Sequence, residues 1–219
     1  MTSQIFDRCC ETQTKIADKF SATGRLDSSQ QWGNVQDWVF TSSIYRRAHI
    51  SVVDARDSHK LWLLHVTVFP HIENGNPIYG FDIVAGPNKV SGAFHDFSPV
   101  YKNSPLSTWF HERTADLDWN KRRELPEWAK PIFSNDIVAI GAVGIEELEK
   151  FCDLGLETLD YYLSELHPET ADMDFSEEQN YYCIQQRKNP HTQRVLQTLG
   201  FNPDEAKDFV YHNLFPLID

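Results

Sequence analysis

Short apolar runs separated by turn residues dominate the chain from residue 35 to residue 97. Such runs, with Gly, Pro, Asn and Asp between them, are typical of β-strands. The connections are too short to hold crossover helices, so neighbouring strands should be antiparallel. The predicted strands are Val35–Ser42, Ile44–Val53, Leu61–Phe69, Ile78–Ala85 and Lys89–Phe97.

Apolar residues recur at helical spacing at both ends of the chain. The first twenty residues predict an amphipathic helix, and most of the chain beyond about residue 104 is expected to be helical. One more strand is predicted at 136–141. The later helices are predicted at 145–166, 175–188, 191–199 and 203–214. We expect one α/β domain over residues 1–219, with a central antiparallel sheet covered by helices.

Two predicted strands, 61–69 and 78–85, are apolar on both faces, so both faces should be covered. His65 and Asp82 interrupt them. In an antiparallel hairpin, two paired residues lie at equal distances along the chain from the centre of the turn, so the centre predicts which residues pair. Centring the three turns between residues 53 and 89 places four polar residues in one row across the sheet, namely His49, His65, Asp82 and Ser91.

A carboxylate in such a row either raises its pKa or pairs with a histidine. Asp82 is therefore a candidate proton donor. A satisfied hydrogen-bonded core network without chemistry is the structural alternative. A zinc or non-haem iron site built from His49, His65, His71 and Asp82 is a second alternative, although no close pair of metal ligands is present.

Composition narrows the function further. The 219 residues carry a net charge of −12, which argues against nucleic acid or an anionic membrane as a partner. The N-terminal residues lack the pattern of a signal peptide, so we expect a cytoplasmic protein. The four cysteines are scattered, which predicts reduced thiols and no iron–sulfur cluster in this chain. Neither a nucleophile elbow nor a dinucleotide-binding glycine motif is present.

Several long segments resemble the ferredoxin-dependent bilin reductases. The resemblance runs in order from about Arg46 to the C-terminus, and is strongest to the phycocyanobilin:ferredoxin oxidoreductases and their phycoerythrobilin-forming (PcyX-type) branch. The segments that carry it are Leu64–Pro70, Gly80–Pro87, Val90–Ala93, Asp96–Pro99, Arg123–Trp128, Ile132–Ser134, Gln185–Asn189 and Thr192 with Arg194–Leu196.

The resemblance implies a three-layer α/β/α sandwich that holds biliverdin IXα between the sheet and the C-terminal helices. It also implies that no flavin, nicotinamide or metal is bound. Electrons would come one at a time from reduced [2Fe-2S] ferredoxin, and side chains would protonate the bilin radicals. A non-catalytic bilin carrier would need the binding residues but no acid in the apolar row.

Site residues follow from the same resemblance. Asp82 matches the catalytic aspartate, His65 its histidine partner, and His49 a second histidine of the proton network. Four further positions match residues that bind or face the substrate: Ser91, Arg123, Gln186 and Asn189. A guanidinium suits a propionate because it binds carboxylates in a fork.

Two positions depart from the phycocyanobilin-forming members. Ser51 stands where they carry a Glu that serves reduction of the D-ring vinyl group, and a hydroxyl cannot act as an acid at neutral pH. His191 stands where they carry a propionate-binding Lys. The sequence therefore predicts phycoerythrobilin, made through 15,16-dihydrobiliverdin, with phycocyanobilin as the alternative product.

The acidic ferredoxin partner requires a local basic surface on this acidic chain. Three clusters could provide it: Arg46-Arg47, Lys121-Arg122-Arg123 and Arg187-Lys188. We expect the protein to act as a monomer.

Overall fold

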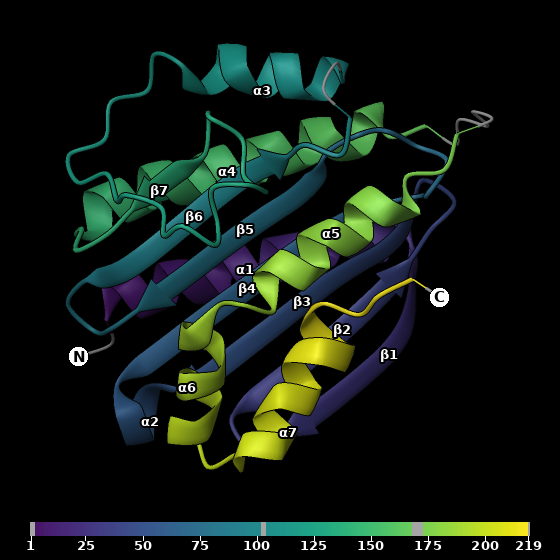
Figure 1. The fold of residues 1–219 in the computed structure, drawn as a ribbon. Coiled ribbons are helices and arrows are strands. Elements are labelled where there is room, and N and C mark those ends of the chain that lie inside the picture. The colour runs from purple at the N-terminus through teal and green to yellow at the C-terminus, as the bar shows by residue number, and fades with distance from the viewer. Residues whose placement is uncertain (1–2, 102–103, 168–172, 219) are drawn as a thin grey trace.

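The computed structural model describes residues 3–101, 104–167 and 173–218 (Figure 1). Its centre is a seven-stranded antiparallel sheet in which the order in space equals the order in sequence, β1 to β7. The strands are β1 (Arg25–Trp32), β2 (Val35–Thr41), β3 (Tyr45–Ala55), β4 (Leu61–Pro70), β5 (Ile78–Ala85), β6 (Val90–Ser98) and β7 (Val138–Ile140).

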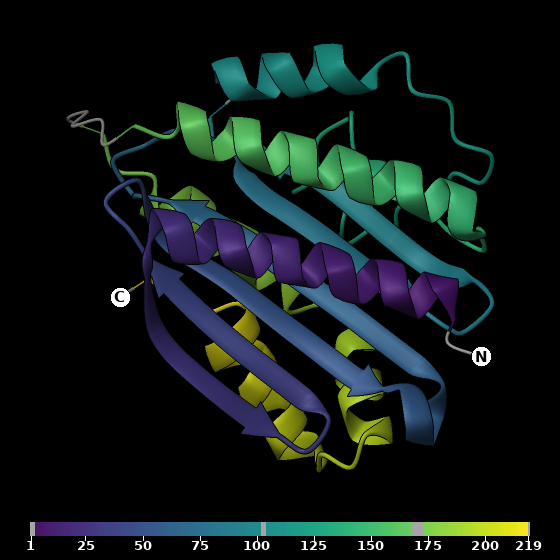
Figure 2. The same ribbon diagram turned by 180° about the vertical axis from the view of Figure 1, so that it is seen from behind.

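Helices cover both faces of the sheet, so the predicted three-layer α/β/α sandwich is confirmed. On one face lie α1 (Gln4–Thr23) and α4 (Ile145–Glu165), with α3 (Pro105–Thr114) outside α4 (Figure 2). On the other face lie α5 (Ser176–Gln186), α6 (Pro190–Thr198), α7 (Pro203–Asp208) and the π-helix η1 (Phe209–Leu214) (Figure 1). A single turn of helix, α2 (Arg56–His59), joins β3 to β4.

The layer beneath α1 and α4 is almost wholly apolar. Alternate residues of β4 and β5, such as Leu64, Val66 and Phe81, are fully buried there. Helix α4 lies very close to β5, because a Cβ added at Gly155 would sit 2.1 Å from the Phe81 ring. Hydrophobic burial of about 25 cal/mol per Å² makes this layer the main source of stability.

The opposite face carries the polar residues of the sheet interior. The C-terminal segment is fastened over it by backbone carbonyls that accept from arginines: Arg47 donates to Asn213, and Arg187 donates to Tyr211 and Phe215. Asn180 on α5 exchanges two hydrogen bonds with the backbone of Ile218. Two of the three predicted basic clusters, Arg46-Arg47 and Arg187-Lys188, therefore each contribute an arginine to hydrogen bonds within the fold.

Three elements differ from the sequence expectations. Strand β1 was not predicted, because its residues are mostly exposed at the edge of the sheet and show no apolar alternation. The connection predicted as a turn at 54–58 forms the short helix α2, which ends one residue later, at His59. The predicted helix 203–214 is α-helical only to Asp208 and continues as η1.

No helix among the described residues has the length and apolar character needed to cross a membrane.

Candidate active site

A histidine and an aspartate lie side by side at the centre of the sheet. His65 on β4 pairs directly with Asp82 on β5, as the turn 70–77 predicted. His65 Nδ1 lies 2.6 Å from Asp82 Oδ1. The His65 side chain is 11% exposed and that of Asp82 is 33% exposed, so the carboxylate is open to one side while the imidazole is enclosed. In this geometry the Asp82 carboxyl could donate a proton to a bound molecule and be reprotonated by the enclosed His65.

The other two predicted pairings in the row are wrong. Ser51, not His49, stands opposite His65, because the helical turn α2 moves the centre of the β3–β4 connection from Asp57 to Ser58. His49 keeps the same face, since it lies two residues from Ser51, and its ring centroid is 5.9 Å from that of His65.

Asp82 pairs with Phe94 rather than with Ser91. The turn after β5 is closed by Gly86 N–H donating to the Lys89 carbonyl, one residue later than expected. A β-bulge between Val84 and Ala85 moves the pairing of β5 with β6 by one more residue. Ser91 is exposed and donates its hydroxyl to the Val84 carbonyl instead of joining the row.

The structure adds an acid that the sequence analysis missed. Asp37 on β2 lies opposite Ser51, is 3% exposed, and has its Oδ1 2.7 Å from His49 Nε2. Its position between Val35 and Val39 on the same face was the available signal, because a carboxylate there interrupts an apolar spacing.

The electrostatics of this second pair follow from burial. Burial, followed by the nearby Arg47 guanidinium, lowers the pKa of His49 to about 4, so its imidazole is neutral at pH 7. Burial alone raises the pKa of the Asp37 carboxyl, but the hydrogen bond to His49 and the charge of Arg47 hold that pKa below its usual value.

Two predicted substrate-binding residues lie together at one end of the row. Arg123 Nη1 donates to the Ser91 carbonyl over 3.1 Å, and its guanidinium lies 5.6 Å from the centroid of the Phe94 ring. The arginine lies close to the backbone here, because a Cβ at Gly141 would come within 2.7 Å of its Cδ. Arg123 and Ser91 are both exposed, so an anion can reach them.

The remaining predicted contacts belong to the helical layer. Gln186 is buried and donates from Nε2 to the Tyr182 hydroxyl, whose ring neighbours Phe215. Phe215 in turn lies edge-on to His65, at 5.4 Å between ring centroids. Asn189 caps α6 by accepting from the backbone N–H of His191, which is exposed.

Among the described residues, no group of three or more His, Cys, Asp and Glu side chains is placed to hold a metal ion. His71, one of the four ligands considered, hydrogen-bonds the Ser42 carbonyl, at the opposite end of β3 from α2.

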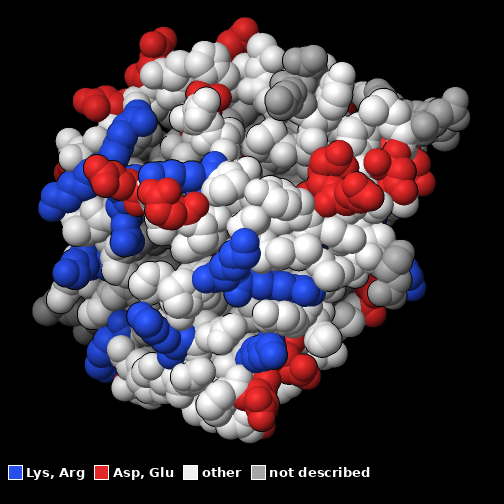
Figure 3. Space-filling model, in the orientation of Figure 1, with Lys and Arg blue, Asp and Glu red and all other residues white. Residues whose placement is uncertain are grey.

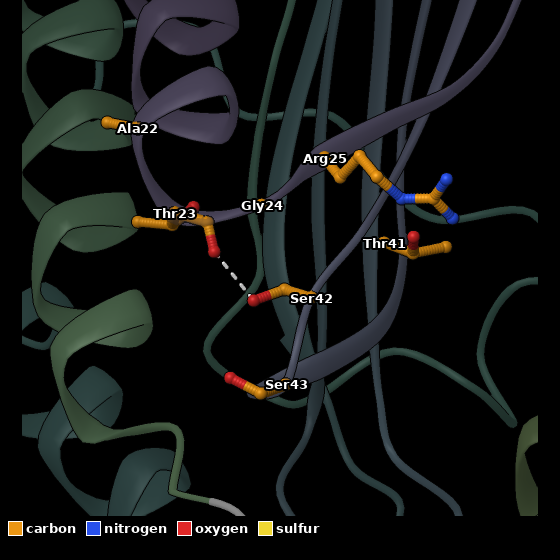
Figure 4. Close-up of a pocket in the computed structure, with 7 residues that line it drawn as sticks. All are labelled: Ala22, Thr23, Gly24, Arg25, Thr41, Ser42 and Ser43. Carbon is orange, nitrogen blue, oxygen red and sulfur yellow. Dashed lines mark hydrogen bonds between the residues drawn. The ribbon is translucent and has the colours of Figure 1, made fainter.

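A surface pocket of about 520 Å³ lies between the end of α1 and the β2–β3 turn (Figure 4). Its lining is Ala22, Thr23, Gly24, Arg25, Thr41, Ser42 and Ser43. None of these side chains can donate a proton as an acid at neutral pH, so this pocket is not a candidate for the reductive chemistry.

A three-layer sandwich with a histidine–aspartate pair at the centre of its sheet is an arrangement suited to proton transfer. The family model described as ferredoxin-dependent bilin reductase matches residues 4–216, and the chain belongs to that family. It is thus an oxidoreductase whose family uses ferredoxin as the electron donor.

Individual relatives agree with this assignment. A phycocyanobilin:ferredoxin oxidoreductase of Prochlorococcus marinus is 33% identical over 79% of this chain and 72% of its own length. The enzyme of that name from Trichodesmium erythraeum is 29% identical over 91% of this chain and 82% of its own length. A solved structure of PcyX is 30% identical, with a TM-score of 0.69 over 96% of this chain and 99% of that one. Phytochromobilin synthase from tomato, solved in complex with biliverdin, shares the fold at 16% identity, with a TM-score of 0.69 over 96% of this chain and 82% of that one.

Proposed function

We propose that this protein reduces biliverdin IXα by four electrons to phycoerythrobilin, through 15,16-dihydrobiliverdin. Reduced ferredoxin supplies single electrons, and Asp82 supplies protons to the bilin radicals. His65 then reprotonates Asp82. The observation that carries the proposal is the Asp82–His65 pair at the centre of the sheet, with the imidazole enclosed and the carboxylate partly exposed. Enclosing the imidazole beside a carboxylate costs free energy, and a role in proton transfer explains that cost.

The product is argued from Ser51. This residue stands directly opposite His65 in the row and is 3% exposed. An acid at this position would be a second proton donor beside the pair, and a serine hydroxyl cannot replace it at neutral pH. With one acidic donor in contact with His65, reduction at the C15–C16 bridge and then at the A-ring is favoured over reduction of a D-ring vinyl group.

Substrate orientation is assigned to the exposed end of the row. Arg123 and Ser91 would hold one propionate, with the guanidinium already fixed against the Ser91 carbonyl and the Phe94 ring. Gln186, Asn189 and His191 would contact the bilin from the helical layer. The enzyme would act as a monomeric single domain.

Ferredoxin docking is assigned to the cluster that remains exposed. Arg47 is buried, Arg46 donates to Gln179, and Arg187 is bound to two carbonyls of the C-terminal segment, so Lys188 is the one exposed residue of these two clusters. Lys121 and Arg122 are exposed beside Arg123. Figure 3 shows basic side chains on the left and in the centre of this face, with some acidic side chains between those on the left. An acidic protein would therefore meet a favourable potential next to the propionate end.

The test is an anaerobic incubation of the purified protein with biliverdin IXα, ferredoxin and a reducing system, followed by chromatography of the bilins. Phycoerythrobilin is the expected product. A bilin with a reduced D-ring vinyl group would contradict the argument from Ser51. Accumulated 15,16-dihydrobiliverdin would restrict the enzyme to two electrons, and bound but unchanged biliverdin would make the protein a carrier.

A further inference from the structure

Three polar atoms are buried without a hydrogen-bond partner on the same face of β3 and β4. They are His49 Nδ1, His65 Nε2 and Thr67 Oγ1. Thr67 pairs directly with His49, and His65 is two residues along the same strand, so the three atoms belong to neighbouring side chains. Buried polar atoms without partners cost free energy, and in a native protein they call for a functional explanation.

The other nitrogen of each ring is already used. His65 Nδ1 is bonded to Asp82, and His49 Nε2 is bonded to Asp37. The two imidazoles therefore lie between two carboxylates, the buried Asp37 and the partly exposed Asp82. The ring centroids are 5.9 Å apart, at 65° to each other.

Asp37 determines which nitrogen of His49 carries the proton. An ionised carboxylate only accepts hydrogen bonds, so the Nε2 that faces Asp37 must be the protonated one. A neutral His49 then carries a bare lone pair on Nδ1. Without the negative charge of Asp37, either nitrogen could hold the proton.

We propose that Asp37 is a positioning residue for the proton supply: by holding His49 in the Nε2–H form it keeps Nδ1 free to take up a proton and pass it on to His65. The proton comes from solvent and passes from His49 Nδ1 to His65 Nε2 through a bridging water, because neither nitrogen has a hydrogen-bond partner of its own. His65 Nδ1–H in turn passes its proton to the Asp82 carboxylate left after each protonation of the bilin. Each transfer breaks one N–H or O–H bond and forms another. Asp37 remains ionised and pairs the charge that His49 carries in between. The part concerning the bilin rests on the proposed function.

The charged and titratable groups around His49 come from three strands. They are Asp37 on β2, Arg47 on β3 and His65 on β4. From the helical layer, the Asn213 carbonyl accepts from Arg47 and the Phe215 ring lies against His65. The charge of Arg47 lowers the pKa of His49 and that of Asp37 raises it. Removing the Asp37 charge should therefore make His49 harder to protonate.

The first test needs no bilin. In ¹⁵N-histidine-labelled protein, His49 should show a protonated Nε2 and an unprotonated Nδ1. In Asp37→Asn the two forms should mix, because the amide can donate or accept. An unchanged His49 spectrum in Asp37→Asn would overturn the proposal whatever the enzyme reduces. Asp37→Ser, with a neutral and smaller side chain, repeats the test if the asparagine variant does not fold.

The second test uses the reaction. Asp37→Asn should slow bilin reduction by at least about tenfold, the lower part of the range for acid–base catalysis. The pH profile should shift, while the dissociation constant for biliverdin stays within about threefold. In a His49→Gln background the same substitution should have no further effect on rate. Equal rate losses in both backgrounds would show that Asp37 does not act through His49.

Asp96→Asn is the matched control. Asp96 is also a buried carboxylate on this face, but its partners are Ser98 and Ser134 rather than a histidine. This variant should change thermal stability without moving the pH profile of the reaction. If Asp96→Asn shifted the pH profile equally, the effect of Asp37→Asn would reflect a general loss of stability, and the proposal would be refuted.

Discussion

At the scale of single residues, the proposed proton donor is a pair of side chains that differ in exposure, since His65 is enclosed and Asp82 is partly open. The pair follows from one register that the sequence predicts correctly, since the 70–77 connection is symmetrical about its centre. Asp37 was not predicted, because its interruption of the apolar spacing between Val35 and Val39 is a weak signal in a strand of seven residues. Its partner His49 was predicted, but through the wrong contact.

Asp82→Asn should bind biliverdin normally but lose turnover by about 10²- to 10⁴-fold, because the amide keeps the shape and lacks the acidic proton. The measurements are the dissociation constant for biliverdin and the single-turnover rate with reduced ferredoxin. Full turnover by this variant would remove Asp82 from the chemistry. Asp57→Asn, at an exposed site on α2, is the matched control and should leave both quantities unchanged.

At the scale of elements, the predicted strand cores of β2 to β6 and the helices α1 and α4 agree with the structure to within about two residues at most boundaries. Periodicity identifies elements whose one face is buried, so it could not identify β1, which is exposed along most of its length. Register depends on turn geometry instead. The helical turn α2 and the bulge at Val84/Ala85 have no signature in hydrophobic spacing, and they moved His49 and Ser91 out of the predicted row.

Close packing of α4 on β5 gives a prediction for stability. Gly155→Ala should lower the free energy of unfolding by about 1–3 kcal/mol, because the new Cβ would overlap the Phe81 ring. The gain in helix propensity, about 1 kcal/mol at most, is smaller. Urea unfolding measures the difference. Gly86→Ala, where the nearest atoms are 3.6 Å away, should change it by less than about 0.5 kcal/mol, and an equal loss at both glycines would refute the packing argument.

At the scale of the whole molecule, the two faces of the sheet have different tasks. The face under α1 and α4 supplies stability, and its one buried histidine among the described residues, His95, is fully bonded to Gly80 and Thr158. The face under α5 to η1 carries the candidate site. The family resemblance implies a bilin on this second face, between the sheet and the C-terminal helices, and that placement stays a prediction. The attachment of the C-terminal segment by Arg47 and Arg187 depends on side-chain reach that no sequence pattern specifies.

Burial lowers the pKa of His95 to about 4, below the value of about 6.5 for an unfolded histidine. The unfolded chain therefore binds the extra proton first, and stability is lost as pH falls from about 6.5 to 4. The free energy of unfolding of the wild type should fall by about 2 kcal/mol more than that of His95→Gln between pH 7 and pH 5. Urea unfolding at both pH values checks this. Burial raises the pKa of Asp96 to about 6, which acts in the opposite sense but equally in both proteins, so parallel curves would disprove the role of His95.

The surface charge gives a prediction for the ferredoxin partner. Reversing Lys121 and Arg122 to Glu should raise the KM for ferredoxin by at least about tenfold, because the local attraction becomes repulsion. Chemistry with a small-molecule reductant should not change. The pair Lys15→Glu and Arg25→Glu alters net charge by the same amount at exposed sites on α1 and β1. If this control pair raises KM as much, total charge rather than a docking site governs the encounter.

The strands of the sheet follow one another in space in the order in which a ribosome makes them. Asp37, Ser51, His65 and Asp82 therefore come together through neighbouring hairpins, with no contact that waits for a distant part of the chain. The helix α1 is made before the sheet it covers, whereas α5, α6, α7 and η1 are made last. During synthesis the face that carries the candidate site is thus the last side of the sheet to be covered by helices.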